Sequence, residues 1–473
     1  MSTSLLEDLS SWCDNSPDDV ALIASGEKLT VQDVVDKVSI LAATLRARKI
    51  PAGSLVAISA DGPREFIGLC AIQAIHAVSV VTPSEGEWHD SGATILVHDG
   101  RDWAGPSAID CSVPSTKSWE DWRSDSTDRS DETVHAVLTS GTTGQPKIVE
   151  LTGSTLRKRT AGYVEVWPVH SAISLFRISS IAGIGAAMAA MHERTPYVPV
   201  HALDRPTIDL IASGDFRQLS GAPNQVIQTI HAVRFTGLAA SFDTILTAGA
   251  PQTPQFRDVV KDVCTGTIAN VYGSTECGTA AYSVEIASAA FTGTPALRSE
   301  FQVVLDDGTL AQPGHEGDVR YRTPAQCTTY RADGVETPVA DDDGWFYPGD
   351  RGFLDTKGNI TITGRTSDIV NVAGAKVNPL PIESAVEQID GVEDAACVPL
   401  TLPDGLTHLA LAISVSNSVA HAAVVSHLES LPRAGRPNIV VDVSEVPRNR
   451  NGKIDRLLLS ERLTAAVRVT PPS

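Results

Sequence analysis

A short segment rich in glycine and hydroxyl residues, residues 138–147, restricts the possible folds of this chain more than any other feature. Apolar residues at 134–138 predict a β-strand before it, and residues 148–152 predict a second strand after it. Glycines let backbone N–H groups approach a phosphate, threonines add hydroxyl donors, and Lys147 adds positive charge. The pattern predicts a phosphate-binding hairpin, with a flexible Gly/Thr hairpin as the alternative.

This hairpin differs from the P-loop of nucleotide triphosphatases. Lys147 follows the second glycine of the segment, Gly144, by three residues, and no serine or threonine comes directly after it. A P-loop also runs into a helix, whereas a strand is predicted here. We therefore expect a different class of nucleotide-binding enzyme.

A second motif, residues 270–276, reads Asn-Val-Tyr-Gly-Ser-Thr-Glu. It combines an aromatic ring at Tyr272, a glycine turn, hydroxyl groups and the carboxylate of Glu276. Such a set can stack on a base, contact phosphate and hold Mg²⁺ through the carboxylate.

Three further residues stand in equally distinctive settings. Asp350 follows a Pro-Gly turn, where its carboxylate can accept the hydroxyl groups of a ribose. Arg365 ends a predicted strand, and Lys453 lies on an Asn-Gly turn near the C-terminus. These residues predict further contacts to a nucleotide.

In this order and spacing, the segments resemble those of the adenylate-forming superfamily. This group contains acyl- and aryl-CoA synthetases, the adenylation domains of peptide synthetases, and firefly luciferase. The resemblance covers nearly the whole chain. It implies that ATP and Mg²⁺ are used to activate a carboxylic acid as an acyl-AMP. The acyl group then passes to coenzyme A or to the phosphopantetheine of a carrier protein.

The resemblance also assigns roles to individual residues. The β- and γ-phosphates of ATP would lie on a loop formed by Thr139, Ser140, Gly141, Thr142, Thr143, Gly144 and Lys147, and adenine beside Gly249, Ala250 and Tyr272. Asp350 and Arg365 would hold the ribose, and Thr275 would contact the α-phosphate. Glu276 would bind Mg²⁺, and Lys453 would contact the reacting carboxylate. The substrate pocket would be lined by Ser180, Gly183, Gly273 and Ser274.

Alternating helix and strand patterns predict an α/β fold of helix-covered sheets. We expect a large N-terminal domain at residues 1–364, whose β-rich subdomain covers about 290–364, and a small α+β domain at 365–473. By the resemblance, the small domain is a mobile lid that carries the catalytic lysine. Its hinge would lie at Ser367 and Asp368, where serine departs from the Asp or Lys commonest in the family.

The substrate region departs from the family pattern as well. Residues 171–190 contain no acidic side chain, whereas amino-acid-activating domains usually keep an aspartate there for the substrate ammonium. An acid without an α-amino group is therefore favoured. The small residues Ser179, Ser180, Gly183 and Gly185 either leave room for an acyl or aryl group or let two helices pack closely. Coenzyme A is the preferred acceptor, a separate carrier protein is the alternative, and a non-catalytic nucleotide-binding relative is the third hypothesis.

Charge and cysteine content narrow the remaining possibilities. The 473 residues include 37 Lys and Arg against 57 Asp and Glu, giving a net charge of −20, which argues against nucleic acid as a partner. Seven cysteines without a CxxC pair favour reduced thiols. Without a signal-peptide pattern or a span-length apolar run, we expect a cytoplasmic protein with no membrane span.

The arginines around the C-terminal lysine turn have two interpretations. Arg448, Arg450 and Arg456 contact the phosphate of coenzyme A, or they form a solvated basic turn. Cys277 follows Glu276 directly but has no evident base partner, so we expect it to pack in the core.

Overall fold

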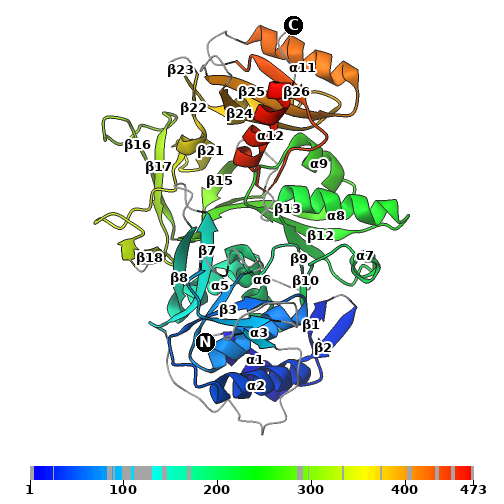
Figure 1. Ribbon diagram of the computed structural model, residues 1–473, viewed down its shortest axis with the longest axis vertical. Coiled ribbons are helices and arrows are strands. Elements are labelled where there is room, and N and C mark those ends of the chain that lie inside the picture. The colour runs from blue at the N-terminus through cyan, green and yellow to red at the C-terminus, as the bar shows by residue number, and fades with distance from the viewer. Residues whose placement is uncertain are drawn as a thin grey trace.

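The computed structural model describes residues 5–24, 26–82, 88, 91–98, 108–110, 130–140, 146–167, 172–284, 291–296, 298–332, 335–372, 375–401, 407–431, 436–448 and 453–469. Figure 1 shows the chain as a stack, with the N-terminal helices at the bottom and the C-terminal segment at the top. Among the described residues, no helix is both long and apolar enough to cross a bilayer.

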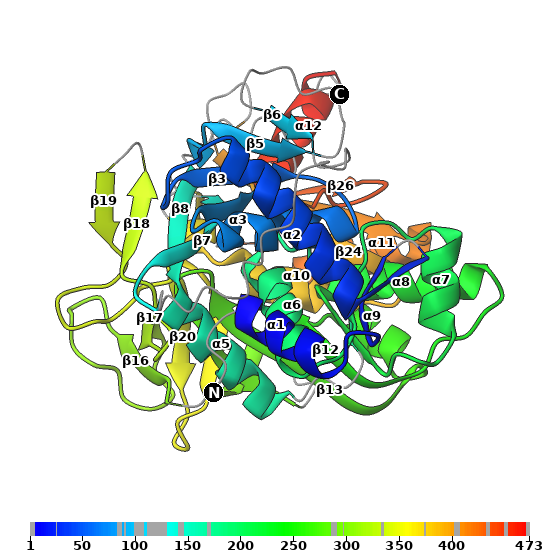
Figure 2. The ribbon, with the colours of Figure 1, turned by 90° about the horizontal axis from the view of Figure 1, so that it is seen from below.

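The N-terminal layer is built on a mixed sheet. In spatial order its eight described strands are β19 (Val335–Pro338), β18 (Thr329–Ala332), β8 (Pro146–Thr152), β7 (Thr133–Ser140), β4 (Val78–Val81), β3 (Leu55–Ser59), β5 (Ile95–His98) and β6 (Ala108–Asp110). Helix α3 (Pro63–Ala74) packs on β3 and β4, and α2 (Val31–Ala47) lies beside α3 (Figure 2). Thr30 caps α2, and it forms a capping box with Asp33.

The second sheet has thirteen described strands. Their spatial order is β16 (Glu300–Val304), β17 (Gly317–Arg322), β20 (Asp350–Leu354), β21 (Ile360–Arg365), β15 (Phe291–Pro295), β14 (Gly278–Ser283), β13 (Cys264–Ser274), β12 (Phe242–Ala248), β11 (Gln218–Gly221), β9 (Ala172–Ser174), β10 (Tyr197–Pro199), β1 (Val20–Ala24) and β2 (Glu27–Thr30). The strands from β1 to β13 in this order pair in parallel, and β1, β10, β9 and β11 are almost continuously buried, as expected for parallel strands covered on both faces.

Helices cover these sheets and join them. Helices α5 (Gly153–Val166) and α6 (Ile181–His192) pack on each other, and α5 contacts both β8 of the first sheet and β14 of the second. The other helices in the described residues of this part are α1 (Leu5–Asn15), α7 (Arg205–Ala212), α8 (Pro223–Phe235) and α9 (Pro254–Val260). One apolar cluster runs from Leu5 through α2, α3 and α6 to Ile362, so the two sheets share a core.

The β-rich segment predicted from residue 290 onwards does not form a sheet of its own. Strand β15 pairs with both β14 and β21, so β15, β16, β17, β20 and β21 extend the second sheet. The hairpin β18–β19 joins the first sheet through β8. Residues 344–349 form no strand: they begin with a turn at Gly344, and Phe346 makes an isolated bridge with Tyr321.

The C-terminal segment has its own sheet and its own apolar clusters. Strands β24 (Val392–Thr401), β25 (Thr407–Val415) and β26 (Ile439–Asp442) pair in that order. One face packs against α10 (Pro379–Val386) and α11 (Ser418–Ser430), and the other against α12 (Arg456–Val469). A short hairpin, β22 (Val370–Val372) and β23 (Ala375–Val377), precedes them. Separate cores are what a separately folded unit requires, and the boundary at residue 365 stays a prediction.

Candidate active site

Lys453 lies among the groups that the sequence predicts to bind a nucleotide. A Cβ atom added at Gly249 would stand 4.0 Å from Cε of Lys453, so the lysine passes the turn after β12. Although the side chain reaches solvent, desolvation by the surrounding protein lowers the pKa of its ammonium group. Arg365 lowers it further, while Asp350 and Glu276 oppose the shift. Lys453 therefore lies beside Gly249 of the predicted adenine site, and it is influenced by the predicted ribose ligand Asp350 and the predicted Mg²⁺ ligand Glu276.

Asp350 is the most deeply buried carboxylate of this group, with 4% of its surface exposed. Nε of Arg365 lies 3.0 Å from Oδ1, and the hydroxyl of Tyr272 donates to Oδ2. Burial raises the pKa of Asp350, against the effect of Arg365. Each carboxylate oxygen retains the capacity to accept a second hydrogen bond, so the pair of ribose hydroxyls still fits this residue.

Tyr272 is held by an aromatic cluster as well as by Asp350. Its ring centroid lies 5.5 Å from that of Phe291 and 5.9 Å from that of Tyr321. These contacts join β13 to β15 and β17, and they fix the ring beside the predicted adenine site. Gly249, with φ of +85°, and the partly buried Ala250 form the neighbouring turn.

Glu276 is linked to the phosphate hairpin through Tyr330. The Tyr330 hydroxyl donates to Oε1 of Glu276 at 2.8 Å, and Nζ of Lys147 lies 4.9 Å from the centroid of the same ring. Burial, followed by the charge of Glu276, raises the pKa of Tyr330, which keeps the hydroxyl protonated as a donor. One aromatic side chain thus sets the positions of a carboxylate and an ammonium group.

Arg159 of α5 holds the backbone on which Thr275 and Glu276 stand. Its guanidinium donates to the carbonyl oxygens of Thr275 and Glu276, each at 2.9 Å, and to that of Ala325 at 3.0 Å. Cys327 adds a sulfur acceptor at 3.3 Å. Burial lowers the pKa of this arginine, and the carbonyl acceptors partly replace the hydrogen bonds to water that the buried guanidinium loses.

The phosphate hairpin is described at its base. Thr139 pairs with Lys147 across β7 and β8, and its hydroxyl donates to the carbonyl oxygen of Lys147 at 3.3 Å. Ser140 ends β7, and its side chain lies outside the described part. The predicted phosphate contacts Gly141, Thr142, Thr143 and Gly144 lie outside the described residues.

Gly273 and Ser274, predicted for the substrate pocket, both shape the turn before Glu276. A Cβ at Gly273 would stand 2.0 Å from the carbonyl oxygen of Gly278, because a β-bulge brings β13 and β14 together there. Ser274 Oγ accepts the backbone N–H of Cys277 at 3.2 Å. As expected, Cys277 is fully buried.

Ser180 and Gly183 are placed by the start of α6. Ser180 caps the helix by accepting the N–H of Gly183 at 3.1 Å, and it donates to the carbonyl of Arg177 at 2.8 Å. A Cβ at Gly183 would stand 1.9 Å from that same carbonyl oxygen. Glycine at position 183 therefore allows a close contact with the loop at Arg177, and not the helix–helix contact considered above. Gly185, in contrast, has no atom within 4 Å of an added Cβ.

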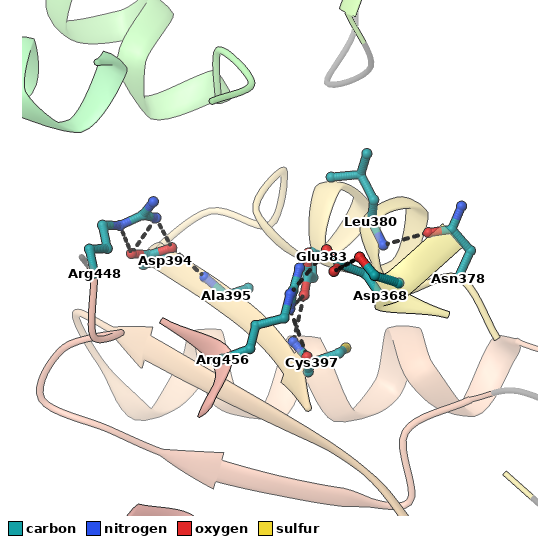
Figure 3. A network of polar contacts seen from close by, with 10 residues as sticks. Asp368, Asn378, Leu380, Glu383, Asp394, Ala395, Cys397, Arg448 and Arg456 are labelled. Atoms are coloured by element: carbon teal, nitrogen blue, oxygen red, sulfur yellow. Dashed lines mark hydrogen bonds and ion pairs between the residues drawn. The ribbon is translucent and has the colours of Figure 1, made fainter. Parts of the chain in front are cut away.

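The predicted hinge residues form a 3₁₀ turn, Thr366–Asp368. The Ser367 hydroxyl donates to Asp368, and Asp368 lies 3.4 Å from Nε of Arg456 (Figure 3). Arg456 is thus paired, so the interpretation of a solvated basic turn is wrong for this residue. It is also wrong for Arg448, whose guanidinium binds Asp394. Arg450 lies outside the described residues.

The residues brought together suit a nucleotide with a divalent cation. Glu276 would hold Mg²⁺ through its carboxylate, a hard oxygen ligand of the kind that the ion prefers. Among the described residues, no group of three or more His, Cys, Asp or Glu side chains forms a complete metal cage. Mg²⁺ commonly binds through one or two carboxylates together with substrate phosphates, so a single carboxylate beside a phosphate hairpin fits that pattern.

Two residues of this site, Tyr330 and Arg159, were not identified from the sequence. Arg159 follows the buried Leu156 by three residues and so shares its helical face, and this spacing was the available signal. Tyr330 lies on a short strand after a loop, where neither periodicity nor a motif marks it.

Comparison with known proteins gives a clear result. A family model described as "AMP-binding enzyme" matches residues 9–331. The long-chain-fatty-acid–CoA ligase FadD13 of Mycobacterium tuberculosis is 26% identical over 353 residues, which cover 71% of this chain and 69% of the relative. The fatty acid–[acyl-carrier-protein] ligase ScoC of Streptomyces coeruleorubidus is 26% identical over 512 residues, with coverage of 97% and 96%.

A solved structure extends the similarity to the fold of almost the whole chain. The o-succinylbenzoate CoA synthetase MenE of Bacillus subtilis, in complex with its acyl-adenylate intermediate, superposes with a TM-score of 0.80. The alignment covers 96% of this chain and 97% of that one, at 18% identity. The predicted α/β fold of helix-covered sheets is thereby confirmed.

Proposed function

Because this chain belongs to the AMP-binding enzyme family and is an acid–thiol ligase of the adenylate-forming superfamily, we propose that it is an acid–CoA ligase. It activates a carboxylic acid with ATP, as the family does, and releases pyrophosphate. In the proposal, coenzyme A then takes the acyl group and AMP leaves.

A single observation supports this proposal most strongly. Lys453, from the C-terminal segment, passes Gly249, and the charges of Arg365, Asp350 and Glu276 act on its ammonium group; these three residues lie on β21, on β20 and just after β13 of the second sheet. A carboxylate that attacks the α-phosphorus of ATP must approach an anion, and negative charge builds on the phosphoryl oxygens during the transfer. An ammonium group at this position offsets that charge. We therefore assign the adenylation step to the arrangement described here.

The surrounding residues would have complementary roles. Asp350, held by Tyr272 and Arg365, would orient the ribose, and Lys147 would bind the phosphates. Glu276 would supply a carboxylate ligand for Mg²⁺, which neutralises phosphate charge when bound. Fixed donors and charges of this kind accelerate the reaction mainly by alignment and electrostatic stabilisation.

For the acceptor thiol, two candidates follow from different relatives. FadD13 is named as a CoA ligase, and ScoC is named as a ligase for an acyl carrier protein. We prefer coenzyme A with a fatty or aryl acid, because residues 171–190 lack an acidic side chain to pair with a substrate ammonium. A carrier protein is the second candidate.

The test is substrate-dependent release of AMP and pyrophosphate with fatty, aryl, amino and β-amino acids, each with and without coenzyme A. Turnover with a fatty or aryl acid, accelerated by coenzyme A and yielding a thioester, is the expected result. Pyrophosphate release that coenzyme A does not accelerate would favour the carrier protein. Turnover restricted to amino acids would contradict the preferred substrate class, and no release with any acid would contradict the proposed activity.

A further inference from the structure

Lys453 does not belong to a regular helix or strand, so its position depends on how the surrounding turn is fixed. The backbone N–H of Asp455 donates to the carbonyl of Pro447 at 2.8 Å, and Arg448 forms an isolated bridge with Ile454. Residues 447–448 are therefore paired with residues 454–455 just before α12 begins at Arg456, and we call these paired residues the hairpin. Two arginines flank the lysine on this hairpin.

Arg456 fixes the C-terminal end of the hairpin. Its guanidinium makes a two-pronged contact with Glu383 of α10, at 2.6 Å to Oε1 and 2.9 Å to Oε2. It also donates to the carbonyl of Cys397 on β24 at 2.7 Å, and Glu383 in turn accepts the backbone N–H of Cys397 at 2.6 Å. Glu383 is only 3% exposed, so these contacts are shielded from water.

Arg448 fixes the N-terminal end in the same manner. One terminal nitrogen lies 2.9 Å from Oδ1 and 2.8 Å from Oδ2 of Asp394, at the start of β24, and Nε lies 3.3 Å from Oδ2. Figure 3 shows both arginines reaching from the lysine-bearing segment to β24 and α10. Both ends of the hairpin are thus anchored to the same rigid unit.

From this geometry we propose that Arg448 and Arg456 are positioning residues for Lys453, and that neither is a contact for the phosphate of coenzyme A. The planar guanidinium fork matches a carboxylate in two places at once, so each pair restricts rotation as well as distance. Because Lys453 is assigned to adenylation alone, loosening the hairpin should affect acyl-AMP formation and spare the thiol step. The inference rests on the proposed function in this respect.

The test uses Arg448→Gln and Arg456→Gln in the full chain, with Arg462→Gln as a matched control, because Arg462 is exposed on α12. The two half-reactions are measured separately: pyrophosphate release with acid and ATP, and thioester formation from supplied acyl-AMP with coenzyme A. We expect each variant to lose roughly 10²-fold in adenylation, as misplacement of a catalytic group does. Thioester formation and its KM for coenzyme A should change less than about threefold, well below the loss expected from misplacement.

A swap variant and a structural measurement complete the test. The double variant Arg448→Asp, Asp394→Arg re-forms the pair in reverse and should recover part of the adenylation rate lost by Arg448→Gln. Amide hydrogen exchange should rise at Arg448, Ile454 and Asp455 in the single variants, and it should stay unchanged in α10 and in Arg462→Gln.

Two outcomes would overturn the inference. One is a rise in the KM for coenzyme A with adenylation intact, which would place the arginines on the coenzyme. The other is unchanged hydrogen exchange at Arg448, Ile454 and Asp455. The exchange measurement does not need turnover, so it tests the anchoring of the hairpin independently of activity. Inactivity of the wild-type enzyme with every acid would contradict the proposed function and not the anchoring.

Discussion

The hydroxyl of Tyr330 donates a 2.8 Å hydrogen bond to the carboxylate of Glu276. The same ring lies beside Nζ of Lys147, so it connects the predicted Mg²⁺ ligand to the phosphate hairpin. Tyr330→Phe removes the hydrogen bond and keeps the ring, whereas Tyr330→Leu removes both contacts. This difference separates the two functions of the side chain.

We expect Tyr330→Phe to require several-fold more Mg²⁺ for half-maximal pyrophosphate release, because a partner that orients a ligating carboxylate typically accounts for about 10–100-fold in metal affinity or activity. Tyr330→Leu should in addition raise the KM for ATP, because Lys147 loses its cation–π contact. Titrating Mg²⁺ and ATP separately for both variants checks this. An unchanged Mg²⁺ requirement in Tyr330→Phe would contradict the assigned role.

The sequence predicts the residues that motifs mark and misses those that only tertiary packing brings in. Tyr272, Asp350 and Arg365 come from distant segments, and the structure brings them into direct contact. Their roles toward a nucleotide stay predictions. Tyr330 carries no motif, and its contact with Glu276 depends on the hairpin β18–β19 joining β8.

Local geometry sets a second limit to prediction from sequence. The sequence shows that residue 183 is small, but it does not show why. A Cβ there would stand 1.9 Å from the carbonyl oxygen of Arg177, and this contact depends on the path of the preceding loop. The paired state of Arg448 and Arg456 was equally hidden, because their partners Asp394 and Glu383 are separated from them in sequence.

Arg159→Met should destabilise the protein and slow adenylation together. The variant leaves the carbonyls of Thr275, Glu276 and Ala325 without their donor, and we expect a loss of about 2–4 kcal/mol in the free energy of unfolding. Urea denaturation measures this loss. The exposed neighbour Lys158→Met on the same helix is the control, with an expected change within about 0.5 kcal/mol. Equal effects of the two variants would contradict the role of Arg159.

Gly183→Ala and Gly185→Ala should have opposite effects, although both lie in α6. At Gly183 the new methyl group would collide with the Arg177 carbonyl, which we expect to cost about 1–3 kcal/mol of stability. At Gly185 the space is open, so the helix preference of alanine should stabilise by about 0.5–1 kcal/mol. Urea midpoints decide between these signs, and destabilisation by Gly185→Ala would show that this position is more crowded than the structure indicates.

Lys453→Ala should nearly abolish acyl-AMP formation while leaving thioester formation from supplied acyl-AMP largely intact. The lysine passes Gly249 and is influenced by the charges of Arg365, Asp350 and Glu276, which form the site where charge on the α-phosphate would develop. Single-turnover measurement of each half-reaction checks this expectation. An equal fall in both half-reactions would mean that Lys453 acts in the thiol step too, or that the variant is misfolded, which circular dichroism would distinguish.

Glu387 should make the stability of the protein depend on pH in an unusual direction. Burial, with the nearby charges of Asp394 and Glu383, raises the pKa of Glu387 from 4.5 to about 8, against Arg448. Between pH 4.5 and about 8 the folded state therefore binds more protons at this residue than the unfolded state does. Its contribution to the free energy of unfolding consequently falls as the pH rises through this range.

Glu387→Gln removes that titration, because glutamine stays neutral at every pH. We expect the variant to gain stability over the wild type at pH 8.5 and little at pH 4, when urea midpoints are compared across the range. Asp390→Asn, which removes an exposed carboxylate just after α10, is the control and should show no such growing difference. A constant gap between Glu387→Gln and the wild type at all pH values would mean that packing, and not ionisation of Glu387, causes the change.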